Sequence, residues 1–376
     1  MRRTTWLGLG LLGWIAAGCG AGPSEPPCKT SACEGARLCT VPVDPAEPGP
    51  WPVGARQLSI DGLTTEVWYP AAFGSERKAE RIVYDVRQVL PPEEVDKIPD
   101  ADSPYQICDC YRNLPPDLKR GPYPVVIFIH GTAGYRMQSL TQMVHWASRG
   151  FVVLAADHPG LYLADMLLLQ LESDLPGDVR SLIAAIDQPD GPLGFLARAL
   201  DSSRIALSGH SAGGMAAGDM AGSAGVRVVI PMAAEGVEPG PDLQAVLVMG
   251  GLADEVVPFE RQQAGYEASP APKHLVGIAG AGHLVFTELC ALTNDAGQDV
   301  VTIAVEHGVT NAELAGQLFD CEVQTIDDEE GWRIVKAYTT ALLEQQLHCV
   351  AREAVLAGLA ERFGAVTSYR FTDNGD

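Results

Sequence analysis

The sequence predicts an α/β fold, with a mostly parallel, doubly wound sheet that has an antiparallel start and helices on both faces. Two strand-like stretches, residues 57–60 and 63–69, follow one another closely and form that start. From Val125 onward, strand-like and helix-like stretches alternate, which is typical of parallel βαβ units. Residues 178–186 repeat apolar side chains at helical spacing, so we expect one face of this helix to lie on the sheet.

Length and composition favour one large domain in a chain of 376 residues. We expect a signal peptide over residues 1–18, a Pro-rich tether with cysteines over 19–52, the main domain over 53–350, and a helical extension and tail over 351–376. The formal net charge of -22 opposes binding to nucleic acid and to bare anionic lipid surfaces, because both carry phosphate charge.

The motif that carries the most information is Gly209-His210-Ser211-Ala212-Gly213. A strand-like stretch precedes it, and a run of small residues that can begin a tightly packed helix follows it. Glycines two positions before and after the serine remove side chains from a turn that is too sharp for a Cβ. The motif therefore predicts a nucleophile elbow that exposes the hydroxyl of Ser211.

A serine needs a base and an acid before it becomes a good nucleophile. Asp254 follows the strand-like residues 244–251, and His283 follows the strand-like residues 274–279 in a glycine-rich loop. The order serine, acid, histidine is the one this architecture requires, and all three positions follow strands at the same sheet edge. We expect His283 to be the general base and Asp254 to orient it. Asp254 could alternatively cap the turn that ends at Pro258.

The other histidines are expected to be core or surface residues, and His210, inside the elbow, to be structural. These are His130, His145, His158, His210, His274, His307 and His348.

The tetrahedral intermediate of acyl transfer needs two N–H donors for its oxyanion. We expect the amides of Ala212 and Thr132 to supply them, since Thr132 lies in a glycine-containing loop after the strand-like residues 125–129. Ala133 is the alternative second donor. Tyr135, just past this loop, is expected to form a pocket wall for substrate, and Asp157 and His158 are weaker candidates at the same edge.

The stretches from His130 to Arg136 and from Trp146 to Gly160 resemble bacterial hydrolases known as predicted dienelactone hydrolases. That group is similar to platelet-activating-factor acetylhydrolases and, more distantly, to cutinase-like polyester hydrolases. The resemblance runs from about Val53 to about Leu347. It implies an α/β-hydrolase fold with Ser211, Asp254 and His283 as the triad and Thr132 as an oxyanion donor. Authentic dienelactone hydrolases use a cysteine nucleophile, so the resemblance does not define the substrate.

These observations predict an exported serine hydrolase, of carboxylesterase or lipase type, that cleaves esters through an acyl-enzyme. A phospholipid deacylase of acetylhydrolase type and a polyester hydrolase are alternatives, and a catalytically silent binding lipoprotein is the alternative outside enzymes. The expected ligand is a small-molecule or lipid-like ester. No phosphate-binding loop or dinucleotide fingerprint is present, so we expect no cofactor. No metal site is expected, because one residue between Cys108 and Cys110 is the wrong spacing for zinc.

The amino terminus predicts export. Arg2 and Arg3 precede an apolar run at residues 6–17 that is too short to span a bilayer, and Cys19 follows small residues. This resembles a bacterial lipoprotein signal, which implies a lipid on Cys19 and anchoring at the outer membrane or its periplasmic face. A plain secretory signal is the alternative.

Eight cysteines remain when Cys19 is set aside, an even number that favours disulfides in an exported protein. Of the possible pairings we predict Cys290 with Cys321. Residues 161–175 form either a lid over the site or a buried helix, and residues 82–120 form a Pro-rich, acidic insertion.

Overall fold

The computed structural model describes residues 28–30, 33, 37–188, 190–196, 198–319 and 321–374. The expected signal peptide and the lipidated Cys19 lie outside these residues. Within the described part of the chain, no helix combines the length and apolar character needed to cross a bilayer.

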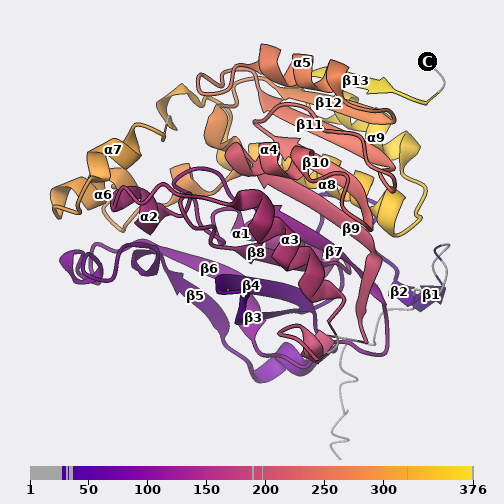
Figure 1. The fold of residues 1–376 in the computed structure, drawn as a ribbon, viewed down its shortest axis with the longest axis horizontal. Coiled ribbons are helices and arrows are strands. Elements are labelled where there is room, and N and C mark those ends of the chain that lie inside the picture. The colour runs from indigo at the N-terminus through magenta and orange to yellow at the C-terminus, as the bar shows by residue number, and fades with distance from the viewer. Residues whose placement is uncertain are drawn as a thin grey trace, which may run out of the picture.

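One sheet of eleven strands runs through the molecule in the order β13-β12-β11-β10-β9-β7-β8-β4-β3-β6-β5 (Figure 1). Strands β8, β7, β9, β10, β11 and β12 are parallel to their neighbours in this order, whereas β4 is antiparallel to β8 and β3 is antiparallel to β4. The expected doubly wound sheet with an antiparallel start is therefore confirmed. The strands are β3 (Val53–Ile60), β4 (Leu63–Pro70), β5 (Arg81–Asp85), β6 (Tyr105–Arg112), β7 (Tyr123–Ile129), β8 (Val152–Ala156), β9 (Leu200–His210), β10 (Val226–Met232), β11 (Ala245–Gly251), β12 (Lys273–Ile278) and β13 (Val366–Thr372).

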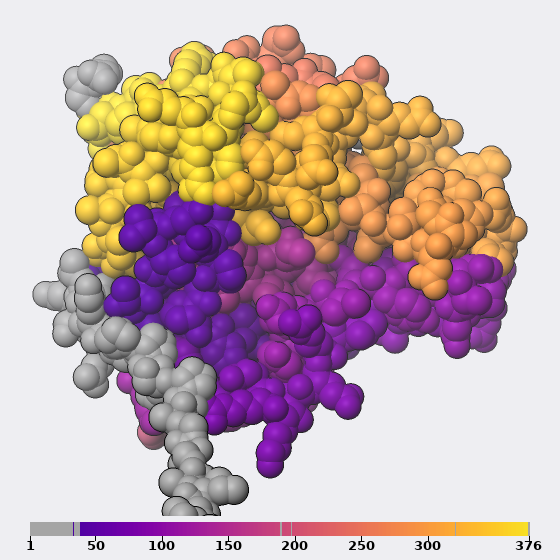
Figure 2. Space-filling model, turned by 180° about the vertical axis from the view of Figure 1, so that it is seen from behind, coloured from indigo at the N-terminus to yellow at the C-terminus, as the bar shows by residue number. Residues whose placement is uncertain are grey.

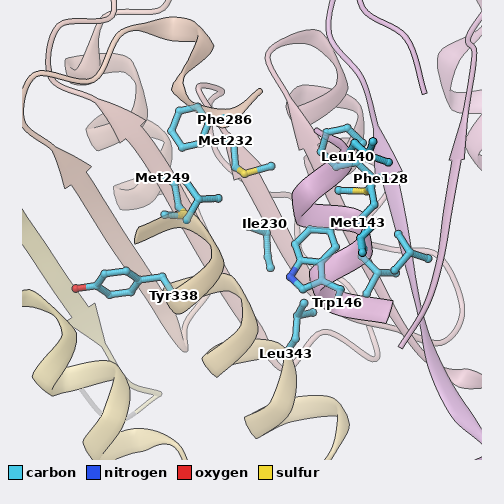
Figure 3. Packing of buried hydrophobic residues seen from close by; sticks show 14 of the residues in the cluster. Phe128, Leu140, Met143, Trp146, Ile230, Met232, Met249, Phe286, Tyr338 and Leu343 are labelled. Carbon is cyan, nitrogen blue, oxygen red and sulfur yellow. The ribbon is translucent and has the colours of Figure 1, made fainter. Parts of the chain in front are cut away.

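Helices cover both faces of the sheet, because the central strands are apolar on both sides. Adjacent residues of β7 belong to different apolar cores: Phe128 lies in the core with α1 and α8, and Ile127 lies in the core with α3, α4 and α5. Figure 3 shows the first core, where Trp146 of α1 and Leu343 of α8 lie close to Ile230. The helices are α1 (Leu140–Ser148), α2 (Leu163–Leu167), α3 (Leu175–Ile186), α4 (Ala212–Asp219), α5 (Phe259–Ala268), α6 (Val300–Glu306), α7 (Ala312–Gly316), α8 (Asp328–Leu347) and α9 (Glu353–Arg362).

The helix expected at residues 178–186 is α3. Its side chains Val179, Leu182 and Ile186 are buried and Ile183 is half-buried, so the apolar face lies on the sheet as the periodicity predicts.

The expected tether is wrong for residues 40–52, which pack against the domain. The buried guanidinium of Arg149 donates to the carbonyl oxygens of Pro42, Asp44 and Glu47, and its Nε donates to Glu344 of α8 at 2.7 Å. A buried arginine needs several acceptors. The irregular segment supplies them, because its carbonyl groups are not used in a helix or strand.

The carboxyl terminus also differs from the expectation, because residues that we expected to form a tail are part of the sheet. Residues 366–372 form β13, which pairs antiparallel with β12 over Lys273 to Ile278 and closes one edge of the sheet. The segment therefore belongs to the main domain. Apart from Val366, its side chains are exposed or half-buried, so the segment gives little hydrophobic signal, as expected of an edge strand.

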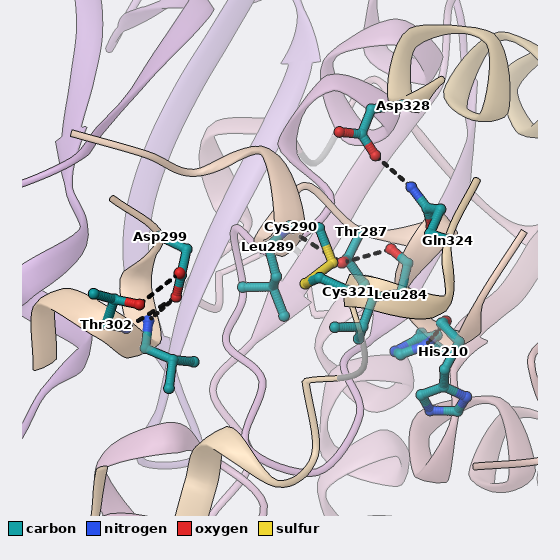
Figure 4. Close-up of a disulfide and its surroundings, with 12 residues drawn as sticks. His210, Leu284, Thr287, Leu289, Cys290, Asp299, Thr302, Cys321, Gln324 and Asp328 are labelled. Carbon is teal, nitrogen blue, oxygen red and sulfur yellow. Dashed lines mark hydrogen bonds between the residues drawn. A yellow bond between two sulfur atoms is a disulfide. The ribbon is translucent and has the colours of Figure 1, made fainter. Parts of the chain in front are cut away.

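The predicted disulfide between Cys290 and Cys321 is present, with an S–S distance of 2.08 Å. It joins the two ends of the segment that contains α6 and α7 (Figure 4). Two further disulfides link Cys33 to Cys349 and Cys108 to Cys110. The first of these attaches the amino-terminal region to the residues that follow α8.

A separate lobe lies beside the carboxyl-terminal ends of the central strands. We define it as residues 86–104, α2, and residues 300–319 with α6 and α7. Figure 2 shows the last of these segments, in orange, lying against the purple segment around residues 80–110. The lobe has a small apolar core of its own that includes Ile98, Leu167 and Ile303.

Residues 161–175 were expected to be a lid or a buried helix, and the structure forms the short helix α2 within them. Leu167 is 2% exposed in the core of the lobe, whereas Leu169 and Leu171 that follow it are each 56% exposed.

Buried histidines make the stability of the fold depend on pH. Burial lowers the pKa of His145 and of His348 from 6.5 to about 3. In the unfolded chain these side chains take up protons near pH 6.5, but in the folded protein they do not. Their contribution to stability is therefore complete above pH 6.5 and is lost as the pH falls from 6.5 toward 3.

We expect His145→Gln, whose amide can still donate to the carbonyl of Pro45, to weaken this dependence. Between pH 6 and 5 the free energy of unfolding should fall less steeply in the variant, by up to about 1.4 kcal/mol per pH unit. Urea unfolding at several pH values measures this slope. The buried carboxyl groups are common to both proteins, so the difference isolates His145. Parallel curves would contradict the prediction.

Candidate active site

Ser211 occupies a turn of one residue between β9 and α4. Its backbone angles are φ 55° and ψ -123°, a conformation that a serine adopts only under constraint. A Cβ on Gly209 would lie 2.3 Å from the carbonyl oxygen of Gly213, and one on Gly213 would lie 2.2 Å from that of Ile129. Both glycines of the motif are thus required by close backbone approach, as the elbow predicts.

Asp254 and His283 form a hydrogen-bonded pair. Nδ1 of His283 lies 2.9 Å from Oδ2 and 3.1 Å from Oδ1 of Asp254, and both residues are buried. A carboxylate can only accept, so Nδ1 carries the proton and Nε2 keeps a lone pair. This is the tautomer that a general base needs.

Asp254 also caps its own loop. Its Oδ1 accepts hydrogen bonds from the amides of Val256 and Val257 at 2.9 and 2.8 Å. The alternative interpretation of Asp254 as a turn cap is therefore correct, and it is compatible with the pairing to His283. The two amides fix the carboxylate in place.

His210 connects the elbow to His283. The Nε2–H of His210 donates to the carbonyl oxygen of His283 at 2.9 Å, and the two rings lie 4.7 Å apart between centroids. The side-chain amide of Gln138 faces the other ring nitrogen, Nδ1, at 3.5 Å. Burial lowers the pKa of His210 well below its usual value, so the ring stays neutral. Ser211, Asp254 and His283 each follow one of the parallel strands β9, β11 and β12, so they lie at the same edge of the sheet.

The loop after β7 lies against the elbow. A Cβ on Gly131 would be 3.0 Å from the Cβ of Ser211, and Thr132 is the next residue. Ala212 is the first residue of α4, so its amide is among the N–H groups that have no acceptor within the helix. Thr132 and Ala212, the two expected donors, are therefore each adjacent in sequence to a residue at the elbow. Ala133, the alternative donor, is buried with φ 57°.

His130 holds this loop in place. Its Nε2 accepts from the amide of His158 at 3.0 Å, and its Nδ1–H donates to the carbonyl oxygen of Gly131 at 2.8 Å. Burial lowers the pKa of His130 to about 3, so it stays neutral. The expectation that it is a core histidine agrees with this position.

Tyr135 is not a pocket wall, which corrects the expectation from sequence. Its side chain is 1% exposed in the core that contains α1, and its hydroxyl donates to Gln106 at 3.4 Å. The weaker candidates are also engaged in buried contacts: Asp157 pairs with Arg136, and Nδ1 of His158 lies 3.0 Å from Asp178. A turn just past a catalytic loop can point inward as readily as outward, and the local sequence does not distinguish the two.

Two supporting residues were missed in the sequence, Gln138 and Glu288. The amide of Glu288, five residues after His283, donates to the carbonyl oxygen of Gln138 at 2.7 Å. The Glu288 carboxylate accepts from the amide of Thr141 and from Gln106, and burial raises its pKa. These contacts join the His283 segment to α1. They are tertiary contacts between distant residues, and no local pattern marks them.

Within the described residues, no cluster of three or more histidine, cysteine, aspartate or glutamate side chains could hold a metal ion.

Comparison with known proteins agrees with this architecture. The family model described as Chlorophyllase matches residues 114–239, a part that includes Ser211 but neither Asp254 nor His283. Among solved structures, a ferulic acid esterase from Streptomyces cinnamoneus is similar, with a TM-score of 0.59 and 18% sequence identity over 88% of this chain and 98% of that chain. No curated protein matches the sequence. The chain has the α/β-hydrolase fold.

The contact from His210 to His283 predicts an effect on the reactivity of Ser211. We expect His210→Phe, which keeps a ring but leaves the carbonyl of His283 unpaired, to cost about 1–3 kcal/mol of stability. Labelling of Ser211 by a fluorophosphonate should also slow, by about tenfold for each 1.4 kcal/mol that the substitution adds to the activation free energy. His210→Gln, which can still donate, should recover part of the loss. A His210→Phe protein that labels as fast as the native one would contradict this role.

Proposed function

We propose that this protein is a serine hydrolase that cleaves carboxylic esters. The observation that carries the proposal is the buried hydrogen bond that Nδ1–H of His283 donates to Asp254, next to the strained elbow that carries Ser211. This bond leaves Nε2 of His283 as the proton acceptor in the immediate surroundings of Ser211. The names of the similar proteins, a chlorophyllase family and a ferulic acid esterase, support ester chemistry.

The reaction proceeds in two halves. The Oγ of Ser211 attacks the ester carbonyl carbon while its proton passes to Nε2 of His283, and the amides of Thr132 and Ala212 stabilise the oxyanion. The tetrahedral intermediate collapses, the C–O bond to the alcohol breaks, and His283 returns the proton to the leaving oxygen. Water then attacks the acyl-enzyme by the same path, which releases the acid and restores Ser211.

Within this class, the resemblance seen in the sequence favours the group that contains the predicted dienelactone hydrolases and the acetylhydrolases. Phospholipid deacylation and polyester hydrolysis remain alternatives for the substrate. Each uses the same attack on an ester carbonyl, so the site chemistry alone does not choose among them.

We also propose that the protein is exported and carries a lipid on Cys19. The three disulfides of the described residues fit an oxidising compartment, where such bonds persist. Incorporation of a labelled fatty acid that disappears in Cys19→Ser tests this proposal, and equal labelling of both proteins would reject it.

The catalytic assignment predicts that a fluorophosphonate labels the native protein and not Ser211→Ala. Asp254→Asn should lower the rate of ester hydrolysis on the order of 10^4-fold, because the amide favours the wrong tautomer of His283. Its fold should persist, since the side-chain oxygen can still accept from Val256 and Val257. Hydrolysis of p-nitrophenyl acetate measures this loss of rate. A folded native protein that neither labels nor hydrolyses any ester would favour the binding lipoprotein instead.

A further inference from the structure

An apolar groove runs through the lobe, between residues 86–104, α2 and the α6–α7 segment. It holds about 580 Å³ of space free of atoms, with the solvent in its open mouth included. The side chains around it are almost all aliphatic or aromatic. They include Val89, Leu163, Leu167, Val300, Ile303 and Phe319.

The polar groups at the groove are already paired. Arg87, its one charged lining residue, donates to Asp85 at 2.7 Å and to the carbonyl oxygen of Ile98 at 2.8 Å. Nearby, Glu94 accepts from the amide and hydroxyl of Thr310 at 2.8 and 2.9 Å. A polar ligand would find no unpaired partner among these groups, so the groove suits a hydrocarbon.

One wall of the groove is joined to the oxyanion loop by a backbone hydrogen bond. The amide of Leu163, a lining residue at the start of α2, donates to the carbonyl oxygen of Gly134 at 3.0 Å. Gly134 follows Thr132 by two residues, so the Cα atoms of these two residues lie within about 7 Å of each other.

The opposite wall is joined to the His283 side of the site. Phe319 and Val300 belong to the segment that the Cys290–Cys321 disulfide closes, and Cys290 follows His283 by seven residues. Figure 4 shows this disulfide beside Leu284 and Thr287, with Asp299 and Thr302 of the α6 region on its far side from His210. One wall is therefore connected to the oxyanion loop, and the other to the segment that follows His283.

We propose that this groove binds the hydrocarbon chain of the ester substrate while the ester group lies at Ser211. The inference rests on the proposed function and adds the substrate class, an ester with a long apolar chain. A hydrocarbon chain is the occupant because the lining is apolar, the polar groups at the groove are paired, and the lining residue Leu163 is hydrogen-bonded to Gly134, two residues after Thr132. Each methylene buried there should improve binding by about fourfold.

A series of p-nitrophenyl esters, from acetate through hexanoate to decanoate, tests the proposal in the full-length protein. We expect kcat/KM to rise with chain length. Ala304→Phe, which places a ring in the groove from α6, should lower kcat/KM for the decanoate at least tenfold and leave the acetate within about twofold. Val305→Phe is the matched control, because Val305 is the next residue of the same helix, is 38% exposed and does not line the groove.

Direct binding separates this inference from catalysis. Ser211→Ala should bind dansyl-undecanoate with a rise in fluorescence, and the double variant with Ala304→Phe should lose that signal. Val301→Phe, another groove position, replaces Ala304→Phe if circular dichroism shows that the latter does not fold.

Unchanged decanoate hydrolysis in the folded groove variants would overturn the inference and leave the proposed function standing. Native protein that hydrolyses no ester would overturn the proposed function, while binding lost with Ala304→Phe would still support an apolar-chain site.

Discussion

The backbone of Ser211 is the constraint on which the site depends. A serine at φ 55° and ψ -123° costs on the order of 1–3 kcal/mol, and it persists because its surroundings leave no alternative. The amide of Ser211 donates to the carbonyl oxygen of Met232 in β10 at 2.9 Å, and Gly213 packs against the end of β7. Three strands and one helix thus hold the turn, and the close packing of the sheet supplies the energy that offsets the strain.

The groups of the proposed triad are positioned by neutral polar contacts as well as by charge. Asp254 is fixed by two amides of its own loop, and the carbonyl of His283 is fixed by His210. His130 fixes the oxyanion loop in a similar way. Burial keeps His130 and His210 uncharged, so they add no positive charge that would oppose protonation of His283 in the proposed reaction. The elbow, the base and the oxyanion loop are in this way parts of one connected network.

Sequence was informative where function depends on local geometry. The glycines around Ser211, the strand ends before Asp254 and His283, and the helical face of α3 each leave a pattern within a few residues. Where structure depends on distant partners, the prediction failed: residues 40–52 look like a linker until Arg149 is seen to bind their carbonyl groups, and Tyr135 looks exposed until Gln106 is found beside it. The role of Gln138 was missed for the same reason, since its partners come from other elements.

The division between sheet and lobe also explains why the type of reaction is easier to predict from the sequence than the substrate. The elbow and the two loops that complete the site are fixed by the parallel sheet, which many sequences can form. The lobe is made of segments that lie between strands of the sheet, and its α6–α7 segment is closed by the Cys290–Cys321 disulfide. Changes in these segments can reshape the groove while the sheet keeps Ser211, Asp254 and His283 in place. Specificity can therefore diverge without loss of the catalytic geometry, because different parts of the chain determine the two properties.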